Sequence, residues 1–113
     1  MSEFTFLFRG RDPFSSQEER LRAMEVWYKW FKELSDKGHL VDPGRPLEPG
    51  GKVVSGVKKI VTDGPFSEIK DVIGGYIIVE AADIEHATDI AKGSPVLDID
   101  GSVEIRPVQK VDR

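Results

Sequence analysis

The stretch VTDGPFSEIKDVIGGYIIVEA, residues 61–81, begins with a turn signal and continues into a nearly continuous apolar run that is a candidate for a strand. Asp63-Gly64-Pro65 is typical of a turn, because proline restricts the preceding residue to extended conformations and aspartate accepts local backbone N–H bonds. The apolar run Gly75–Val79 predicts a buried strand. Two interpretations of Asp63 therefore stay open: its carboxylate only shapes a corner of the chain, or it is held at a site.

Upstream of this stretch, the pattern predicts a strand followed by a long helix. Glu3–Arg9 (EFTFLFR) repeats phenylalanine with a period of two, as a half-buried strand requires. Ser15 and Ser16 precede two glutamates and can form a capping box, and Gly38 is a natural C-terminal stop. Apolar residues at steps of three and four predict one buried stripe along the helix: Leu21, Met24, Trp27, Phe31 and Leu34, widened by Trp30.

The remaining elements are a hairpin, a strand, a second helix and a last strand. Val41–Gly51 is rich in proline and glycine and predicts a loop. The short β-branched runs Lys52–Val54 and Val57–Val61 predict a tight hairpin. Asp83 can cap the second helix, and Ser102–Pro107 is the last strand candidate.

This order of elements predicts an α+β, ferredoxin-like fold, βαββαβ with an extra hairpin, in a single domain of residues 1–113. Such a sheet carries helices on one face, so a second copy is the simplest cover for the other face, and we expect a homodimer. We expect the first strand to pair with the third and the last to lie beside the second. That arrangement allows Arg9 and Arg106 to lie on different sides of the sheet.

Composition excludes several classes of protein. The 113 residues are 39% hydrophobic and 32% charged, as in an ordinary globule, and no apolar run approaches the roughly 20 residues that cross a bilayer. The first residues do not resemble a signal peptide, so we expect a cytoplasmic protein without a membrane partner. The absence of cysteine excludes disulfides, a thiolate nucleophile and thiolate metal sites.

Nucleic acid, metals and cofactors are also unexpected partners. The net charge of −4 argues against binding to phosphate backbones. His39 and His86 do not follow a ligand spacing, so we expect neither a metal nor a cofactor. The helical spacing of Trp27, Trp30 and Phe31 favours packing in the core or at a subunit interface over a stacking platform.

The segments VTDGPFSEIKDVIGGYIIVEA, AKGSPVL (91–97) and GSVEIRPV (101–108) resemble the YCII-related family, specifically its DGPF-domain branch. The resemblance implies a dimeric α/β barrel of ferredoxin-like subunits. It also implies relatives of two kinds, proteins labelled as transcription-initiation factors and a dehydrochlorinase branch. Shorter relatives pair a first-helix histidine with the aspartate that matches Asp63. This chain has QEERL (17–21) there, so that proton relay does not carry over.

Asp63, Glu68 and Lys70 are the charged candidates for a site. Asp63 can act as a general base in an apolar cleft, or it can simply satisfy a turn. Glu68 and Lys70 alternate along one segment and can face the same cleft, or they are solvated loop charges.

Three more residues are candidates for binding a ligand and not for catalysis. Tyr76 offers a phenolic donor beside a glycine, or it packs in the core. Arg9 can bind an anionic ligand through its planar guanidinium, or it pairs with Glu104 or an aspartate at the surface. Phe66 of the DGPF tetrapeptide would contribute an aromatic wall.

We therefore expect a small homodimer that binds a small organic molecule in a cleft lined by Asp63, Phe66, Glu68 and Tyr76. If it is an enzyme, the chemistry open to it is proton transfer, as in elimination, isomerisation or decyclisation, with Asp63 as the base. The alternative is a non-catalytic ligand-binding or protein-interaction module associated with transcriptional regulation. The sequence leaves catalysis itself undecided.

Overall fold

Residues 1–10, 13–64 and 71–110 are described in a computed structural model of the chain. Within these ranges, no helix is both long enough and apolar enough to cross a membrane. The elements follow the chain as β1 (Ser2–Arg9), α1 (Gln17–Asp36), β2 (Leu40–Asp42), β3 (Gly51–Ser55), β4 (Ile60–Gly64), β5 (Ile73–Ala81), α2 (Ile84–Ala91), a 3₁₀ helix (Pro95–Ile99) and β6 (Ser102–Pro107).

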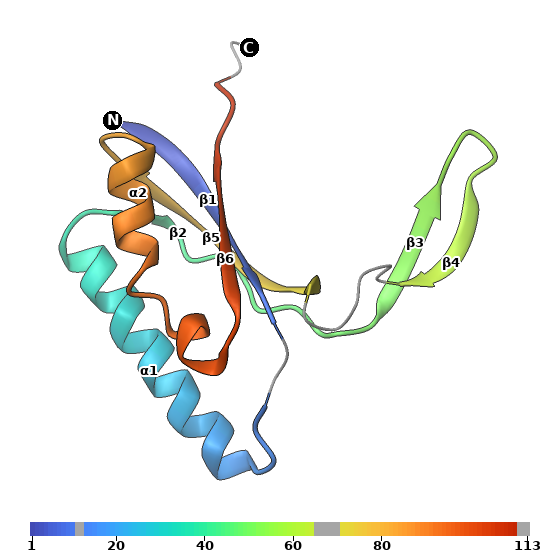
Figure 1. Ribbon diagram of the computed structural model, residues 1–113, viewed down its shortest axis with the longest axis horizontal. Coiled ribbons are helices and arrows are strands. Elements are labelled where there is room, and N and C mark those ends of the chain that lie inside the picture. The colour runs from blue at the N-terminus through green and yellow to red at the C-terminus, as the bar shows by residue number, and fades with distance from the viewer. Residues whose placement is uncertain (11–12, 65–70, 111–113) are drawn as a thin grey trace.

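The main sheet is antiparallel and has the strand order β2-β5-β1-β6, while β3 and β4 pair with each other. Both described α-helices lie on one side of the main sheet (Figure 1). This α+β arrangement is compatible with a ferredoxin-like fold. The pairing of β1 with β5 confirms the expected contact of the first and third sheet strands.

The position expected for the last strand is wrong, because β6 lies beside β1 and not beside the second strand. Strand β5 already pairs with β1 on one edge and with β2 on the other. The free edge of β1 is therefore the place where β6 can pair with a central strand. This register places Arg106 opposite Thr5 and Ser102 opposite Arg9. Arg9 and Arg106 therefore share one face of the sheet, and the separation that the expected strand order allowed is not found.

The core lies between this sheet and the two helices. Phe4, Phe6 and Phe8 of β1 are buried, and the strands place Phe4 opposite Val79 and Phe6 opposite Ile77 of β5. The period-two pattern of the first strand predicted this face. The opposite face of the sheet, which we call the open face, carries the alternate side chains Thr5, Leu7, Arg9, Tyr76, Ile78, Glu104 and Arg106.

Helix α1 begins where the capping signal predicted. The Ser16 side chain accepts from the backbone N–H of Glu19 at 3.1 Å, and the Ser15 N–H donates to the Glu19 carboxylate at 3.0 Å. These bonds satisfy donors that the first turn leaves unpaired. At the other end, Gly38 follows the last turn with a φ of +77°, which glycine adopts without strain.

The predicted apolar stripe of α1 is buried only in its C-terminal half. Trp30 and Leu34 are buried, whereas Leu21 is 52% exposed and Met24 is 46% exposed. The N-terminal turns of α1 extend past the end of the sheet, which agrees with this exposure (Figure 1).

The tryptophans of α1 pack in the core, as their spacing predicted. The ring of Trp27 lies 4.9 Å from Phe8 and 5.9 Å from Trp30, edge to face in both cases. Such pairs contribute about 0.5–1.5 kcal/mol beyond their apolar area. Phe31 completes the cluster, 5.7 Å from Trp27.

The second strand of the main sheet, Leu40–Asp42, overlaps the region that the sequence assigned to a loop. It has three residues, which is too short for a period to be visible. The hairpin is confirmed with a longer turn than predicted, at residues 56–59, where Gly56 and Lys59 have φ values of +75° and +55°.

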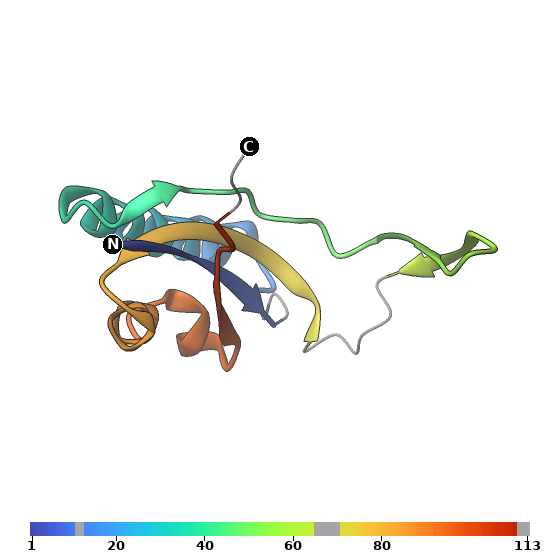
Figure 2. The ribbon, with the colours of Figure 1, turned by 90° about the horizontal axis from the view of Figure 1, so that it is seen from above.

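The β3–β4 hairpin, residues 51–64, projects away from the rest of the chain, and we call it the arm (Figures 1 and 2). The connection that leads into it is tied to β5, because the Leu47 N–H donates to the Gly74 carbonyl at 2.8 Å. The radius of gyration is 15.7 Å, whereas a compact chain of this length has about 13 Å. The arm makes the single chain extended.

Candidate functional site

An open pocket lies where the arm meets the main sheet. Its volume is about 280 Å³, near the lower end of the roughly 300–1,000 Å³ of small-molecule sites. It is lined by Arg9 at the end of β1, by residues 47–53 of the connection and β3, and by residues 71–73 at the start of β5. Leu47, Val53 and Ile73 supply apolar wall. The pocket therefore combines apolar walls with a few charged groups, as ligand sites commonly do.

Arg9 is the most firmly held charged group of this pocket. Its Nη1 donates to the Asp71 carbonyl at 2.6 Å, and its Nη2 donates to the Glu104 carboxylate at 2.9 Å. Glu104 also accepts from Arg106 at 3.1 Å. The sequence predicted that Arg9 pairs with Glu104 as one alternative, and this contact is confirmed. The carbonyl and the carboxylate orient the guanidinium at the pocket wall.

The two arginines change the acidity of Glu104. The hydrogen bond from Arg9 and then that from Arg106 lower the pKa of this carboxyl from its ordinary value of 4.5, against a smaller effect of burial. A lowered folded-state pKa means that the folded protein binds the ionised form better than the unfolded chain does. The stabilising contribution is therefore present above the ordinary value and is lost as the pH falls through the folded-state pKa.

We expect Glu104→Gln to lower the melting temperature slightly at neutral pH and progressively less as the pH falls below 4.5. The difference is small because the pair is partly solvated. Thermal unfolding of both proteins across this pH range measures it. The control Glu25→Gln, at an exposed position of α1, should show no such convergence. A difference that grows on acidification would contradict the assignment.

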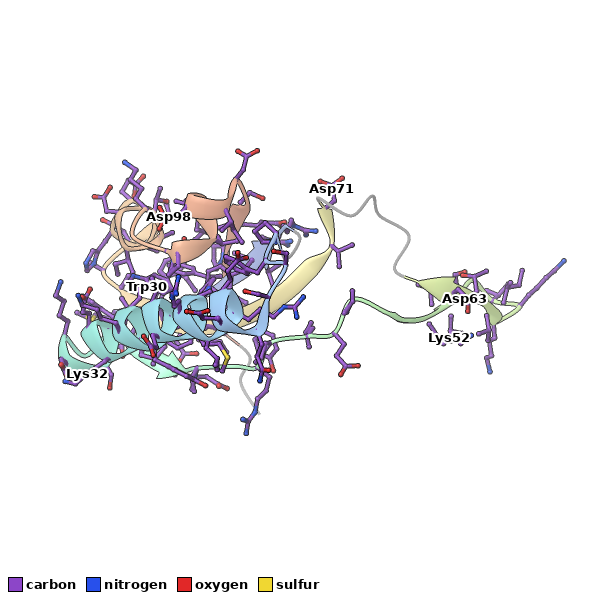
Figure 3. All side chains as sticks on the ribbon, turned by 90° about the horizontal axis from the view of Figure 1, so that it is seen from below. Trp30, Lys32, Lys52, Asp63, Asp71 and Asp98 are labelled. Carbon is purple, nitrogen blue, oxygen red and sulfur yellow. The ribbon has the colours of Figure 1, made fainter. Side chains whose placement is uncertain are left out.

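Asp63 lies on the arm, in β4, and not among the residues that line the pocket. Its carboxylate forms an ion pair with Lys52, the residue opposite it in β3. Lys52 itself lines the pocket, so Asp63 is linked to the pocket through its partner. The side chain of Asp63 is 89% exposed in the single chain, and Figure 3 shows the pair on the arm, away from the core around Trp30.

The other predicted site residues are distributed differently. Phe66, Glu68 and Lys70 lie outside the described residues. Tyr76 is half-buried on the open face of β5, opposite Leu7, and does not line the pocket. Of the predicted set, the structure thus places Arg9 in the pocket lining, and Asp63 outside it, paired with the lining residue Lys52.

Sequence reasoning missed Lys52 and the backbone carbonyl of Asp71. Lys52 had a signal, because a lysine and an aspartate at equivalent positions of a hairpin face each other across the strands. The carbonyl of Asp71 had none, since any residue supplies one and only the fold brings it to Arg9.

The histidines come together although they are distant in sequence. The rings of His39 and His86 lie 5.1 Å apart, edge to face. The Nδ1 atom of His86 accepts from the Ala82 N–H at 3.0 Å, and that of His39 lies 3.2 Å from the Glu80 carbonyl. Both rings are thus engaged at the end of the sheet away from the arm. Among the described residues, no group of three histidine or acidic side chains is placed to hold a metal ion.

An antiparallel sheet with two helices on one face defines an α+β domain, compatible with a ferredoxin-like fold. A model of the YCII-related domain matches residues 5–112, and the chain belongs to this family. The resemblance drawn from the sequence is thereby confirmed at the level of the family, while the DGPF-domain branch stays a prediction.

One solved structure to which the chain is similar is 5-chloro-2-hydroxyhydroquinone dehydrochlorinase (TftG) from Burkholderia phenoliruptrix AC1100, in complex with 2,5-dihydroxybenzoquinone. It is 15% identical, with a TM-score of 0.48, and the match covers 95% of this chain and 93% of that one. No curated protein is significantly similar in sequence.

Proposed function

We propose that this YCII-family protein is a cytoplasmic homodimer that binds a small organic anion in the pocket beneath the arm. The observation that carries the proposal is the oriented guanidinium of Arg9 in a pocket whose lining combines apolar side chains with the charged residues Glu48, Lys52 and Asp71. An arginine held by a carbonyl and a carboxylate keeps its direction, so a ligand's carboxylate or phenolate meets it at little entropic cost. Lys52 adds a second positive charge at the rim.

In the catalytic form of this proposal, Asp63 takes a proton from the bound molecule in an elimination or isomerisation. One feature supports it: the carboxylate pairs with Lys52, a residue of the pocket lining, which would hold it in place beside a ligand. Phe66, Glu68 and Lys70 belong to the same segment of the sequence and stay the predicted additional contacts. Proton transfer by one positioned carboxylate typically accelerates a reaction by about 10²–10⁴-fold.

The second candidate is a binding module without catalysis, associated with transcriptional regulation. The exposed ion pair of Asp63 with Lys52 favours it, because a carboxylate already matched to an ammonium serves well as a structural or ligand-orienting group. Both forms of the proposal share the ligand and the pocket. They differ only in whether the ligand leaves chemically changed.

The homodimer in this proposal is supported by the open face of the sheet. Leu7, Tyr76 and Ile78 form its apolar centre, and neither helix covers them. Two such sheets packed face to face would bury these side chains in a dimeric α/β barrel.

A thermal-shift screen against small phenols and carboxylates tests ligand binding directly. A ligand present at about 100 times its dissociation constant stabilises the folded protein by about 2.7 kcal/mol. Hits are then incubated with the protein and analysed by mass spectrometry, which separates the enzyme from the binding module. Failure of every anionic compound to raise the melting temperature, with Arg9→Met behaving like wild type throughout, would contradict the proposed site.

We expect Asp63→Asn to keep the melting temperature within a few degrees and to lose binding or turnover of such a hit. The mutation preserves size and, in the single chain, breaks only an exposed ion pair, worth about 0–1 kcal/mol. It removes the charge and the proton acceptor together. Asp98→Asn, the same change at an exposed position on the body of the molecule, is the matched control and should change neither property. Intact binding and turnover in Asp63→Asn would mean that residues 61–76 only turn the chain and that Asp63 is not part of a site.

A further inference from the structure

We propose that the arm is an intermolecular element: in the homodimer of the proposed function, on which this inference rests, it packs on the second copy. The arm exposes four large apolar side chains, with 64% of Val54, 98% of Val57, 57% of Ile60 and 60% of Val61 accessible. An isolated two-stranded hairpin is marginally stable in water and needs a further surface to pack on. Among the described residues, β3 and β4 make their main contacts with each other.

The accessible surface area of the single chain is larger than that of a compact monomer, as expected if a partner covers part of it. The accessible surface is 8430 Å², whereas a compact monomer of this mass exposes about 6,200 Å². The excess of about 2,200 Å² per chain falls in the range that obligate dimers bury, about 1,000–2,500 Å² per partner.

Position and charge identify the partner as another copy of this chain. The arm projects on the side of the sheet away from the helices, which is the side of the open face (Figure 1). A copy packed on the open face therefore comes within reach of the arm, and two-fold symmetry makes the contact reciprocal. Residues 51–64 carry three lysines and one aspartate, a charge of +2, and the remaining 13 basic and 19 acidic residues carry −6. The arm and the rest of the chain are thus opposite in net charge, which favours the approach of a second copy.

This packing brings the pocket rim to the interface. Residues two apart in a strand share a face, so Lys52 and Asp63 lie on the same face of the arm as Val54 and Val61. When the valines pack on the second copy, the ion pair beside them is covered as well. The pocket, which is open in one chain, is then closed by the partner, and Asp63 loses the solvent that surrounds it in the monomer.

The test combines Val54→Glu with Val61→Lys in one chain. These residues are opposite each other, so the new pair preserves the hairpin and the net charge while removing the apolar contact. By sedimentation equilibrium, the wild type should be a dimer at micromolar concentration, and the double variant should dissociate at least about 100-fold more readily. The control combines Ile84→Glu with Leu97→Lys, two 43% exposed positions on the helical side, and should dimerise like wild type.

The outcomes separate the inference from the proposed function. A double variant that dimerises as tightly as wild type overturns the role of the arm and leaves the homodimer standing. A wild type that is monomeric at 100 µM overturns both the arm contact and the homodimer, and the ligand screen still tests the pocket. A dissociated double variant beside a dimeric control supports the inference.

Hydrogen exchange of the wild type gives the same information without a mutation. Backbone amides of residues 52–54 and 60–63 should be protected at high protein concentration and lose protection on dilution below the dissociation constant. Amides in the middle of β1 are the internal control and should change far less. Arm amides that exchange rapidly at every concentration would overturn the inference.

Discussion

Phe6→Ala should lower the free energy of unfolding by about 3–5 kcal/mol, the usual cost of deleting a large buried aromatic side chain. Phe6 is fully buried at the centre of β1, between the facing strand β5 and the helices. Its cross-strand neighbour Ile77 is held in place by the sheet register, so the cavity collapses only partly. For a domain with a total stability of about 5–15 kcal/mol, this is a large fraction.

Urea unfolding at a fixed protomer concentration measures this loss, because the stability of a dimer depends on concentration. The control is Leu97→Ala, at a 43% exposed position of the 3₁₀ helix, which should cost well under half as much. Equal costs at the two positions would mean that Phe6 is not at the centre of the core.

Gly44→Ala should destabilise the chain by about 2–4 kcal/mol and displace the connection that leads into the arm. Gly44 has a φ of +57°, where a Cβ atom is strained. That Cβ would also lie 1.8 Å from the carbonyl oxygen of Tyr76, a backbone atom that cannot move aside without distorting β5. The Gly44 N–H is held by the Asp42 carboxylate at 2.8 Å, so the turn has little freedom to adapt.

The matched control is Gly50→Ala in the same connection. A Cβ at Gly50 meets no atom within 4 Å, and its φ lies outside the positive region. This variant should therefore be neutral in urea unfolding. If the arm is an intermolecular element, Gly44→Ala should also weaken the dimer, whereas Gly50→Ala should not. A stable Gly44→Ala variant would show that the connection does not approach β5 this closely.

The sequence predicted the elements whose signals are local. The alternation of Phe4, Phe6 and Phe8, the cap at Ser16 and the cap at Asp83 each act within a few residues, and the structure confirms all of them. The hairpin was also visible, because its β-branched runs flank a glycine. The three-residue strand β2 was not, since its pairing with β5 depends on a partner more than thirty residues away.

The residues of the candidate site also divide into those that the sequence singled out and those that only the fold brings to the site. The resemblance and the turn chemistry singled out Asp63, and the chemistry of arginine singled out Arg9. The contact of Arg9 with the Asp71 carbonyl spans 62 residues, and no pattern of side chains encodes a carbonyl. The separation of Tyr76 from the pocket also depends on the pleat, which turns it to the open face.

By itself, the sequence determined the class of fold, the family and the absence of thiol chemistry, because composition, period and caps are properties of short stretches of chain. Only the tertiary structure decided that β6 lies beside β1, that Arg9 and Arg106 share Glu104, and that residues 51–64 stand apart as an arm. The physical reason is that strand order and the position of an arm follow from contacts between distant segments. Their free energy depends on which surfaces are left to bury once the local elements have formed.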